Sequence, residues 1–197
     1  MSSHPRDFDS ATVDAIKNNP KMSRSIHLPV QSGSDKILKL MNRHYTTERY
    51  LQLVDEIRTK IPNVTLSTDI IVGFPNETED DFNQTIDLVK KVEFNGIFAY
   101  MYSIRKGTPA EKMGDQIPQK IKNERVNILL NLEKEIQAKN KVNLLGKVER
   151  VLICGKDKSK KYVLAKTDCG REVLLTNTLD DTIRFGKAKI TQIDKKC

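Results

Sequence analysis

Three stretches of this chain share one order: a short apolar run, then a polar loop that contains glycine. They are residues 25–34 (SIHLPVQSGS), 65–78 (TLSTDIIVGFPNET) and 96–110 (GIFAYMYSIRKGTPA). In α/β folds, such loops at the carboxyl ends of strands, feeding helix N-termini, bind ligands. The repetition therefore predicts a parallel sheet whose three loops gather at one end.

Helical patterns separate these stretches. Apolar residues recur at helical spacing over residues 9–18, 35–41, 46–60, 79–92 and 119–143. Thr78 is the expected N-cap of the fourth helix, with Asp81 three residues further on. The acidic run at residues 79–81 suits a helix N-terminus, which favours negative charge, better than it suits a metal site.

From residue 146 onward the pattern changes to that of short strands. We expect strands at residues 148–154, 162–167, 172–175 and 188–193, with polar turns between them. Several short strands in quick succession predict a small β-barrel. The chain is therefore expected to form two domains, residues 1–143 and 144–197.

Three motifs resemble those of the radical-SAM methylthiotransferases, in the same order. They are HLPVQSGSDKILKLMNRHYT, TDIIVGFPNETEDDF and YSIRKGTPA. The QSGS loop with MNRHYT is most similar to the MiaB-type branch, which adds a methylthio group to isopentenyladenosine beside the tRNA anticodon. The resemblance implies an α/β fold: the C-terminal part of a radical-SAM, partial TIM-type parallel barrel, followed by a small all-β barrel similar to the TRAM/OB type.

The resemblance implies two cofactors, S-adenosylmethionine (SAM) and [4Fe–4S] clusters. The family's CxxxCxxC motif is absent, and the three cysteines (Cys154, Cys169 and Cys197) have no such spacing. A cluster takes thiolate ligands, typically four, so we expect free cysteines and no metal site here. In the family an SSHPRD segment lies mid-chain, whereas here it follows Met1. We therefore expect a chain that lacks the N-terminal half and is inactive by itself.

The resemblance assigns SAM binding to polar residues of the first two loops and of the segment after the first. These are Gln31, Ser32, Ser34, Arg43, Asp69 and Gly73. Arg43 suits the SAM carboxylate, and Gly73, without a β-carbon, suits close approach to the adenine. The alternatives are structural: Asp69 pairs with a lysine or arginine, Arg43 braces its own loop, and Gln31 and Ser32 only cap a helix. The catalytic residues stay unknown.

Positive charge is concentrated in the second part of the chain. Residues 1–114 hold 15 basic and 15 acidic side chains, whereas residues 115–197 hold 19 and 11. A basic part beside a neutral one favours a polyanionic partner, although a solvated lysine-rich surface is an equal alternative. The residues assigned to RNA or substrate binding are Arg105, Lys147, Arg150, Lys160, Lys161, Tyr162 and Lys166.

The predicted function is thus tRNA methylthiolation, with the anticodon stem-loop and the missing N-terminal half as partners. Within the class, the alternative target is threonylcarbamoyl-adenosine in tRNA or a ribosomal protein. In another class, the alternative is a non-catalytic RNA-binding protein on a barrel remnant. Exposed strand edges invite pairing, so we expect either a dimer or covering of these edges. With no long apolar run and no signal peptide, we expect no membrane association and a cytoplasmic location.

Overall fold

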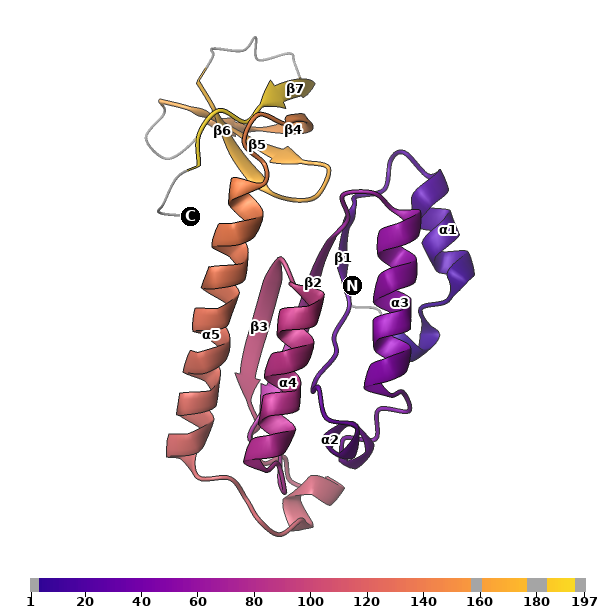
Figure 1. The fold of residues 1–197 in the computed structure, drawn as a ribbon, viewed down its shortest axis with the longest axis vertical. Coiled ribbons are helices and arrows are strands. Elements are labelled where there is room, and N and C mark those ends of the chain that lie inside the picture. The colour runs from indigo at the N-terminus through magenta and orange to yellow at the C-terminus, as the bar shows by residue number, and fades with distance from the viewer. Residues whose placement is uncertain (1–3, 157–160, 177–183, 194–197) are drawn as a thin grey trace.

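The protein consists of a parallel sheet with its helices and an antiparallel sheet, joined by one long helix. The computed structural model describes residues 4–156, 161–176 and 184–193. Figure 1 shows the antiparallel sheet at the C-terminal end of this long helix. The expected mixed α/β class is confirmed.

The first sheet holds three parallel strands in the order β1 (Ser25–His27), β2 (Thr65–Val72) and β3 (Gly96–Met101). Side chains of a strand alternate between the two faces. Along β2, Leu66 and Ile70 are buried, whereas Asp69 between them is half-buried. One face of the sheet is therefore packed into the core, and we call the other the open face.

Helices cover the packed face. Its core joins strand residues with helix residues such as Tyr50, Leu53 and Phe82. The predicted helices are confirmed to within a residue. Side-chain caps define the starts of several of them: Thr46 accepts from Arg49 N and Thr78 from Asp81 N, whereas the helix that begins at Gln119 has no such cap. The helices are η1 (Pro5–Asp7), α1 (Ser10–Asn18), α2 (Asp35–Leu40), α3 (Thr47–Lys60), α4 (Glu79–Val92), η2 (Pro109–Lys112) and α5 (Gln119–Val142).

Helix α5 connects the two sheets. Its 24 residues span about 36 Å at 1.5 Å per residue. It packs along β3, where Glu133 accepts a hydrogen bond from Ile97 N at 2.8 Å. Leu129 and Ile136 bury its inner side in the core. In the part of the chain that the structure describes, neither α5 nor any other helix is long and apolar enough to span a bilayer.

The second sheet is antiparallel, with four described strands in the order β6-β5-β4-β7. The prediction of a last strand at residues 188–193 is wrong, because the strand is Phe185–Lys189. Pairing with β4 decides its position: Phe185 lies opposite Leu152 and Lys189 opposite Val148. A turn-like local sequence around Gly186 concealed this pairing. The strands are β4 (Val148–Lys156), β5 (Val163–Thr167), β6 (Glu172–Leu175) and β7 (Phe185–Lys189).

The turn between β5 and β6 docks against the N-terminal ends of β1 and β2. The carbonyl of Asp168 accepts a hydrogen bond from Arg24 N at 2.8 Å. Cys169 donates from Sγ to the carbonyl of Asn63 at 2.8 Å, and its own carbonyl accepts from Thr65 Oγ1 at 2.9 Å. The antiparallel sheet therefore sits at the end of the parallel sheet away from the predicted ligand loops.

Candidate ligand-binding edge

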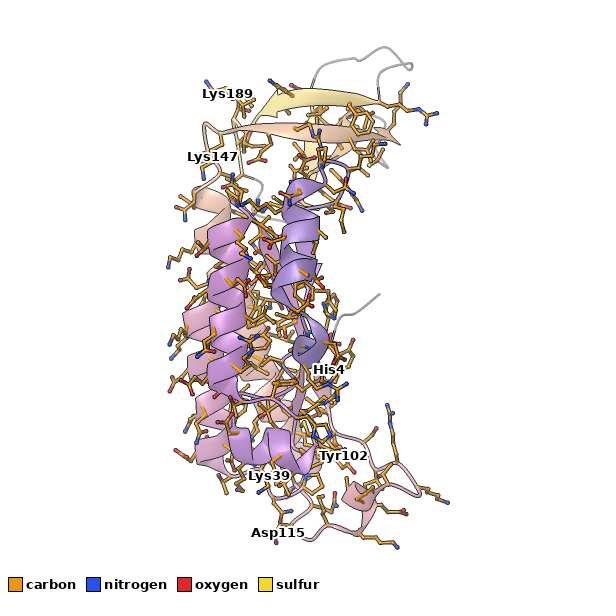
Figure 2. The ribbon with its side chains drawn as sticks, turned by 90° about the vertical axis from the view of Figure 1, so that its right-hand side faces the viewer. His4, Lys39, Tyr102, Asp115, Lys147 and Lys189 are labelled. Atoms are coloured by element: carbon orange, nitrogen blue, oxygen red, sulfur yellow. The ribbon has the colours of Figure 1, made fainter. Side chains whose placement is uncertain are left out.

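The loops after β1, β2 and β3 lie at one end of the parallel sheet, because the three strands run in the same direction. We call this end the loop edge and define it as residues 29–45, 73–78 and 102–110. Figure 2 shows Tyr102 and Asp115 toward this end of the molecule and Lys147 and Lys189 at the other. The loop edge is where the sequence predicts the cofactor site.

Gln31 holds a strained backbone conformation at the loop edge. Its φ is +69°, which costs a non-glycine residue about 1–2 kcal/mol. Strand-like hydrogen bonds keep it there: Gln31 N donates to Asp69 O, and Ile71 N donates to Gln31 O, each at 2.9 Å. Such backbone strain clusters at ligand sites, which supports Gln31 as a candidate ligand-binding residue.

The two predicted serines of this loop point into the protein. Ser34 caps α2, and its hydroxyl donates to Asp81 at 2.7 Å. Ser32 is fully buried, with its Oγ 3.5 Å from Thr85 Oγ1. Gly33 lies so close to α4 that a β-carbon on it would come within 2.4 Å of Thr85 Cα. The shape of the loop is therefore set by its contact with α4.

Asp81 ties this loop to the start of α4. Its carboxylate accepts hydrogen bonds from Lys36 Nζ at 2.7 Å and Thr78 N at 2.9 Å, besides the one from Ser34. Burial by itself would raise the pKa of Asp81, but these hydrogen bonds outweigh burial and hold the pKa well below its ordinary value. The acidic start of α4 is thus a capping box, as its spacing predicts.

Gly73 is required by its contact with α5. Its φ is +70°, and the side chain of Lys122 fills the space where a β-carbon would lie, with Cγ only 2.4 Å away. Gly73 N donates to Glu77 Oε2 at 2.7 Å, and the same carboxylate forms a buried ion pair with Arg125. Burial raises the pKa of Glu77, against the effects of Gly73 N and Arg125. Sequence analysis missed Glu77, Lys122 and Arg125 because this contact is long-range.

Asp69 lies on the open face, and its ionisable neighbour is a histidine rather than a lysine or arginine. His27 Nε2 is 3.4 Å from Asp69 Oδ1, and His27 Nδ1 is 3.0 Å from Ser67 Oγ. The imidazole packs edge-on against the ring of Phe98, with centroids 5.8 Å apart. Asp69 remains partly exposed, with 27% of its side chain accessible. This arrangement leaves carboxylate oxygen available to a ligand.

Arg43 offers an unpaired nitrogen at the same edge. Its Nε is buried and has no hydrogen-bond partner within the described ranges. Beside it, Tyr45 donates from its hydroxyl to Val30 O at 3.0 Å, and burial raises the pKa of Tyr45 to about 12. The ring of His4 lies edge-on to Tyr45, and burial, aided by Arg43, lowers the pKa of His4. An unpaired guanidinium nitrogen suits an anionic group such as a carboxylate.

The predicted RNA-binding residues do not form one group. Arg105 is exposed on the loop edge, whereas Lys147 is exposed at the other end, before β4 (Figure 2). Arg150 is already engaged: its guanidinium binds Asp168 at 2.9 Å and donates to Pro20 O at 3.2 Å. These contacts hold the antiparallel sheet in place. Of the remaining predicted residues, Lys160 lies outside the described residues, Lys161 and Tyr162 are exposed, and Lys166 lies 3.9 Å from Glu172.

One face of the antiparallel sheet combines exposed apolar and basic side chains. Leu152 pairs with both Lys166 and Phe185, so the three share a face. Phe185 is 65% exposed, a large value for an aromatic strand residue. We call this the outer face; it comprises Val148, Arg150, Leu152, Lys166, Glu172, Phe185, Lys187 and Lys189. Sequence analysis missed Phe185 because it placed the last strand too far along the chain.

The two described cysteines, Cys154 and Cys169, are not grouped to hold an iron–sulfur cluster, and Cys197 lies outside the described residues. Cys154 is exposed, whereas Cys169 is buried and bonded to Asn63. Within residues 4–156, 161–176 and 184–193, no three His, Cys, Asp or Glu side chains are grouped to hold a metal ion. We therefore derive no chemical step through a cluster on this chain. At the loop edge, Arg43 Nε lacks a partner among the described residues and Asp69 is partly exposed, so these two groups are open to a polar ligand.

Comparison with known proteins relates the parallel sheet and its loop edge to one class of enzyme. The sequence model of the Radical SAM superfamily matches residues 1–89, which include β1, β2 and their loops. Three bacterial relatives narrow the assignment, and each carries the name tRNA-2-methylthio-N(6)-dimethylallyladenosine synthase. The chain is thus similar to the Radical SAM superfamily over residues 1–89 and to these named synthases over nearly its whole length, in agreement with the resemblance carried by its three motifs.

The similarity to these relatives extends over nearly the whole chain. The Clostridium botulinum (strain Okra / Type B1) protein is 47% identical over 196 residues, 99% of this chain and 43% of the relative. The Fusobacterium nucleatum protein is 45% identical over 98% of this chain and 44% of its own length. The Carboxydothermus hydrogenoformans protein is 43% identical over 97% and 44%. The chain thus spans less than half the length of these relatives.

Proposed function

We propose that this chain supplies the SAM-binding loop edge and an RNA-binding sheet of an enzyme that adds a methylthio group to isopentenyladenosine next to the tRNA anticodon. The observation that carries the proposal is 47% identity, over 99% of the chain, to a protein named tRNA-2-methylthio-N(6)-dimethylallyladenosine synthase. SAM would supply a methyl group and a carbon radical when bound. The iron–sulfur clusters belong to the remainder of the enzyme, so this chain alone is inactive.

Each residue of the loop edge has a proposed task toward SAM. The Arg43 guanidinium binds the carboxylate, because its Nε has no partner in the described part of the chain. Asp69, held by His27, accepts a hydrogen bond from the ribose or the ammonium. Gln31 contributes its side-chain amide, and Gly73 is proposed to contact the adenine through its backbone, since the space left by its missing β-carbon is filled by Lys122. Ser32 and Ser34 act through the loop shape that they stabilise.

Calorimetric titration of the chain with SAM tests this site. We expect binding by the native chain and about tenfold weaker binding by Arg43→Gln, the loss of one charge-assisted hydrogen bond. Arg49→Gln is the matched control, because Arg49 is exposed on α3 outside the loop edge. Equal SAM affinity of the native chain and Arg43→Gln would remove Arg43 from the site.

RNA is proposed to bind the outer face. Lys166, Lys187 and Lys189 supply charge for phosphates, and Phe185 supplies an exposed ring on which a base can stack. Lys147, Lys161, Tyr162 and Arg150 are proposed to extend or support this surface, and Lys160, outside the described residues, keeps only its predicted role in RNA binding. Arg105 is proposed to meet RNA or substrate at the loop edge, about 36 Å away along α5. An RNA that reaches both ends must span that length, which favours a whole anticodon stem-loop.

Affinity for an anticodon stem-loop tests the outer face. Phe185→Ala should weaken binding about tenfold, within the range for one base stack, and Lys187→Gln with Lys189→Gln should flatten the salt dependence. Ile128→Ala is the control for Phe185→Ala, because Ile128 is an exposed apolar residue on α5, outside both proposed binding surfaces. RNA affinity that Phe185→Ala leaves unchanged would move the interface elsewhere.

Two alternatives remain distinguishable. Methylthiolation of threonylcarbamoyl-adenosine or of a ribosomal protein is disfavoured by the QSGS loop, and product analysis with the full-length enzyme decides it. A non-catalytic RNA-binding protein is favoured by one observation: the described residues hold no group that suits a cluster. Strong RNA binding without any SAM binding would support that second function.

The barrel types, the domain boundary, the partners of the open strand edges and the cellular location are also proposals. We propose that β1–β3 belong to a partial TIM-type barrel and that the antiparallel sheet belongs to a TRAM/OB-like barrel, with the division at residues 143 and 144. The open edges of β1 and β3 would pair with the N-terminal half of the family's barrel or, failing that, with a second copy. Sedimentation of the chain with and without an N-terminal half tests this. A cytoplasmic location follows from tRNA as substrate.

A further inference from the structure

Tyr102 follows β3 directly and is held at the loop edge from several sides. Its backbone N–H donates to Val72 O at 2.8 Å, so it extends the pairing with β2. Its ring packs edge-on against Phe74, with centroids 5.0 Å apart. The ammonium of Lys122 lies 5.4 Å from the ring centroid and donates to Tyr102 O at 2.9 Å. The ring position is therefore well determined (Figure 2).

The hydroxyl of Tyr102 is buried, and it makes no hydrogen bond to the described residues of the protein. By contrast, Tyr45 and Tyr50 donate from their hydroxyls to Val30 O and Leu28 O, at 3.0 and 2.8 Å. Burying an unpaired hydroxyl is unfavourable, and phenylalanine would keep the ring contacts without that cost. A hydrogen-bond partner from outside the chain, such as a ligand, would remove this cost.

The segment after Tyr102 is exposed and held by local contacts. Residues 103–107 are exposed, and the hydrogen bonds described for residues 103–108 stay local. Thr108 Oγ1 donates to Arg105 O at 2.8 Å, and Gly107 N donates to Glu111 at 2.8 Å. No described hydrogen bond ties this segment to the loops after β1 and β2.

We propose that the Tyr102 hydroxyl binds the adenosine part of a ligand at the loop edge, by a hydrogen bond to its ribose or base. This inference rests on the proposed function. A flat heterocycle with polar edges suits a strand end that offers both exposed aromatic faces and a hydroxyl. Phe98 and Tyr100, earlier on β3, are 54% and 53% exposed. SAM and the target nucleotide of the RNA both contain adenosine, so the experiment must separate these two sources.

The test is Tyr102→Phe, which keeps the contacts with Phe74 and Lys122 and removes only the hydroxyl. Calorimetric titrations with SAM and with an anticodon stem-loop RNA measure affinity, and thermal unfolding of the ligand-free chain measures stability. We expect an unchanged or higher melting temperature and about fivefold weaker binding of one ligand. Tyr50→Phe is the matched control: its hydroxyl is bonded within the protein, so it should lower the melting temperature and leave affinity unchanged.

Each outcome is decisive. Weaker SAM binding assigns the hydroxyl to the cofactor, and weaker RNA binding assigns it to the target adenosine. Native affinities in Tyr102→Phe overturn the inference while leaving the proposed function intact, and a lower melting temperature with native affinities reveals a structural role instead. If the native chain binds neither ligand, the proposed site on this chain fails, and the inference fails with it.

Discussion

Single residues at the loop edge act mainly through contacts that are distant in sequence. Glu77 and Arg125 form an ion pair whose side chains are 1% and 6% exposed. Glu77 in turn accepts from Gly73 N, and Arg125 lies over the ring of Phe82, 5.2 Å from its centroid. One buried pair thus holds the Gly73 loop against both α4 and α5.

Arg125→Ala should lower the free energy of unfolding by about 3 kcal/mol, because it leaves the Glu77 carboxylate buried without its cation. Urea unfolding measures the change. Glu79→Gln is the matched control, since Glu79 is the exposed partner of Arg125, with 75% of its side chain accessible, and exposed pairs contribute less than about 1 kcal/mol. Similar losses in both variants would contradict the special role of the buried pair.

Asp81 predicts an acid-sensitive contribution to stability. Its pKa is lower in the folded chain than the ordinary value of 3.8, so its stabilising effect is present above that value. The effect is lost as pH falls from there through the folded-state pKa. Asp81→Asn should therefore have a lower melting temperature than the native chain at neutral pH. This difference in melting temperature should become smaller in acid. Melting curves across this pH range check it, and a difference that stays constant would contradict the assignment.

At the scale of elements, close packing between a loop and a helix shapes the candidate site. The QSGS loop lies directly on α4, and the place of Gly33 there leaves no room for a side chain. A β-carbon would approach Thr85 Cα to 2.4 Å and Gln84 O to 2.6 Å. Because both atoms belong to the backbone of α4, no side-chain rotation relieves the clash.

Gly33→Ala should accordingly cost about 2 kcal/mol of stability, the usual size of an overpacking effect. It should also weaken SAM binding, because the loop must shift. Gly114→Ala serves as the control, since a β-carbon there meets nothing within 4 Å; its effect should stay within about 0.5 kcal/mol. Urea unfolding and SAM titration of the two variants give the comparison, and equal stabilities would show that the loop can yield.

At the scale of the whole molecule, the turn between β5 and β6 links the two sheets. Cys169 lies in this contact, and burial raises the pKa of its thiol. A thiol held in its neutral form and out of solvent reacts slowly with alkylating reagents. Cys154, by contrast, is exposed on β4. The two cysteines together therefore report whether the sheets stay docked.

Alkylation of the folded chain at mildly alkaline pH should modify Cys154 much faster than Cys169, and urea should abolish the difference. Peptide mass spectrometry distinguishes the sites. Thr65→Val removes the hydrogen bond to Cys169 O and should speed the reaction of Cys169 alone. If Cys169 reacts as fast as Cys154 in the native chain, the turn is not docked in solution.

Elements with local signals could be predicted from the amino-acid sequence alone. The caps at Ser34, Thr46 and Thr78 each bond a residue three positions away, so spacing alone located their helices. The order of strand, polar loop and helix likewise predicted that the three loops meet at one end of the sheet. The candidate residues there, including Arg43 and Asp69, came from the resemblance of the loop motifs to a known family.

Only the tertiary structure decided which residues meet across the chain. It gave Asp69 its neighbour His27, directed Ser34 to Asp81 and brought Arg125 to Glu77. It also set the last strand at Phe185–Lys189 through pairing with β4. The physical reason is that these contacts join residues far apart in sequence, whose meeting depends on how whole elements pack. Propensity and spacing describe a residue's near neighbours, and they carry no information about that packing.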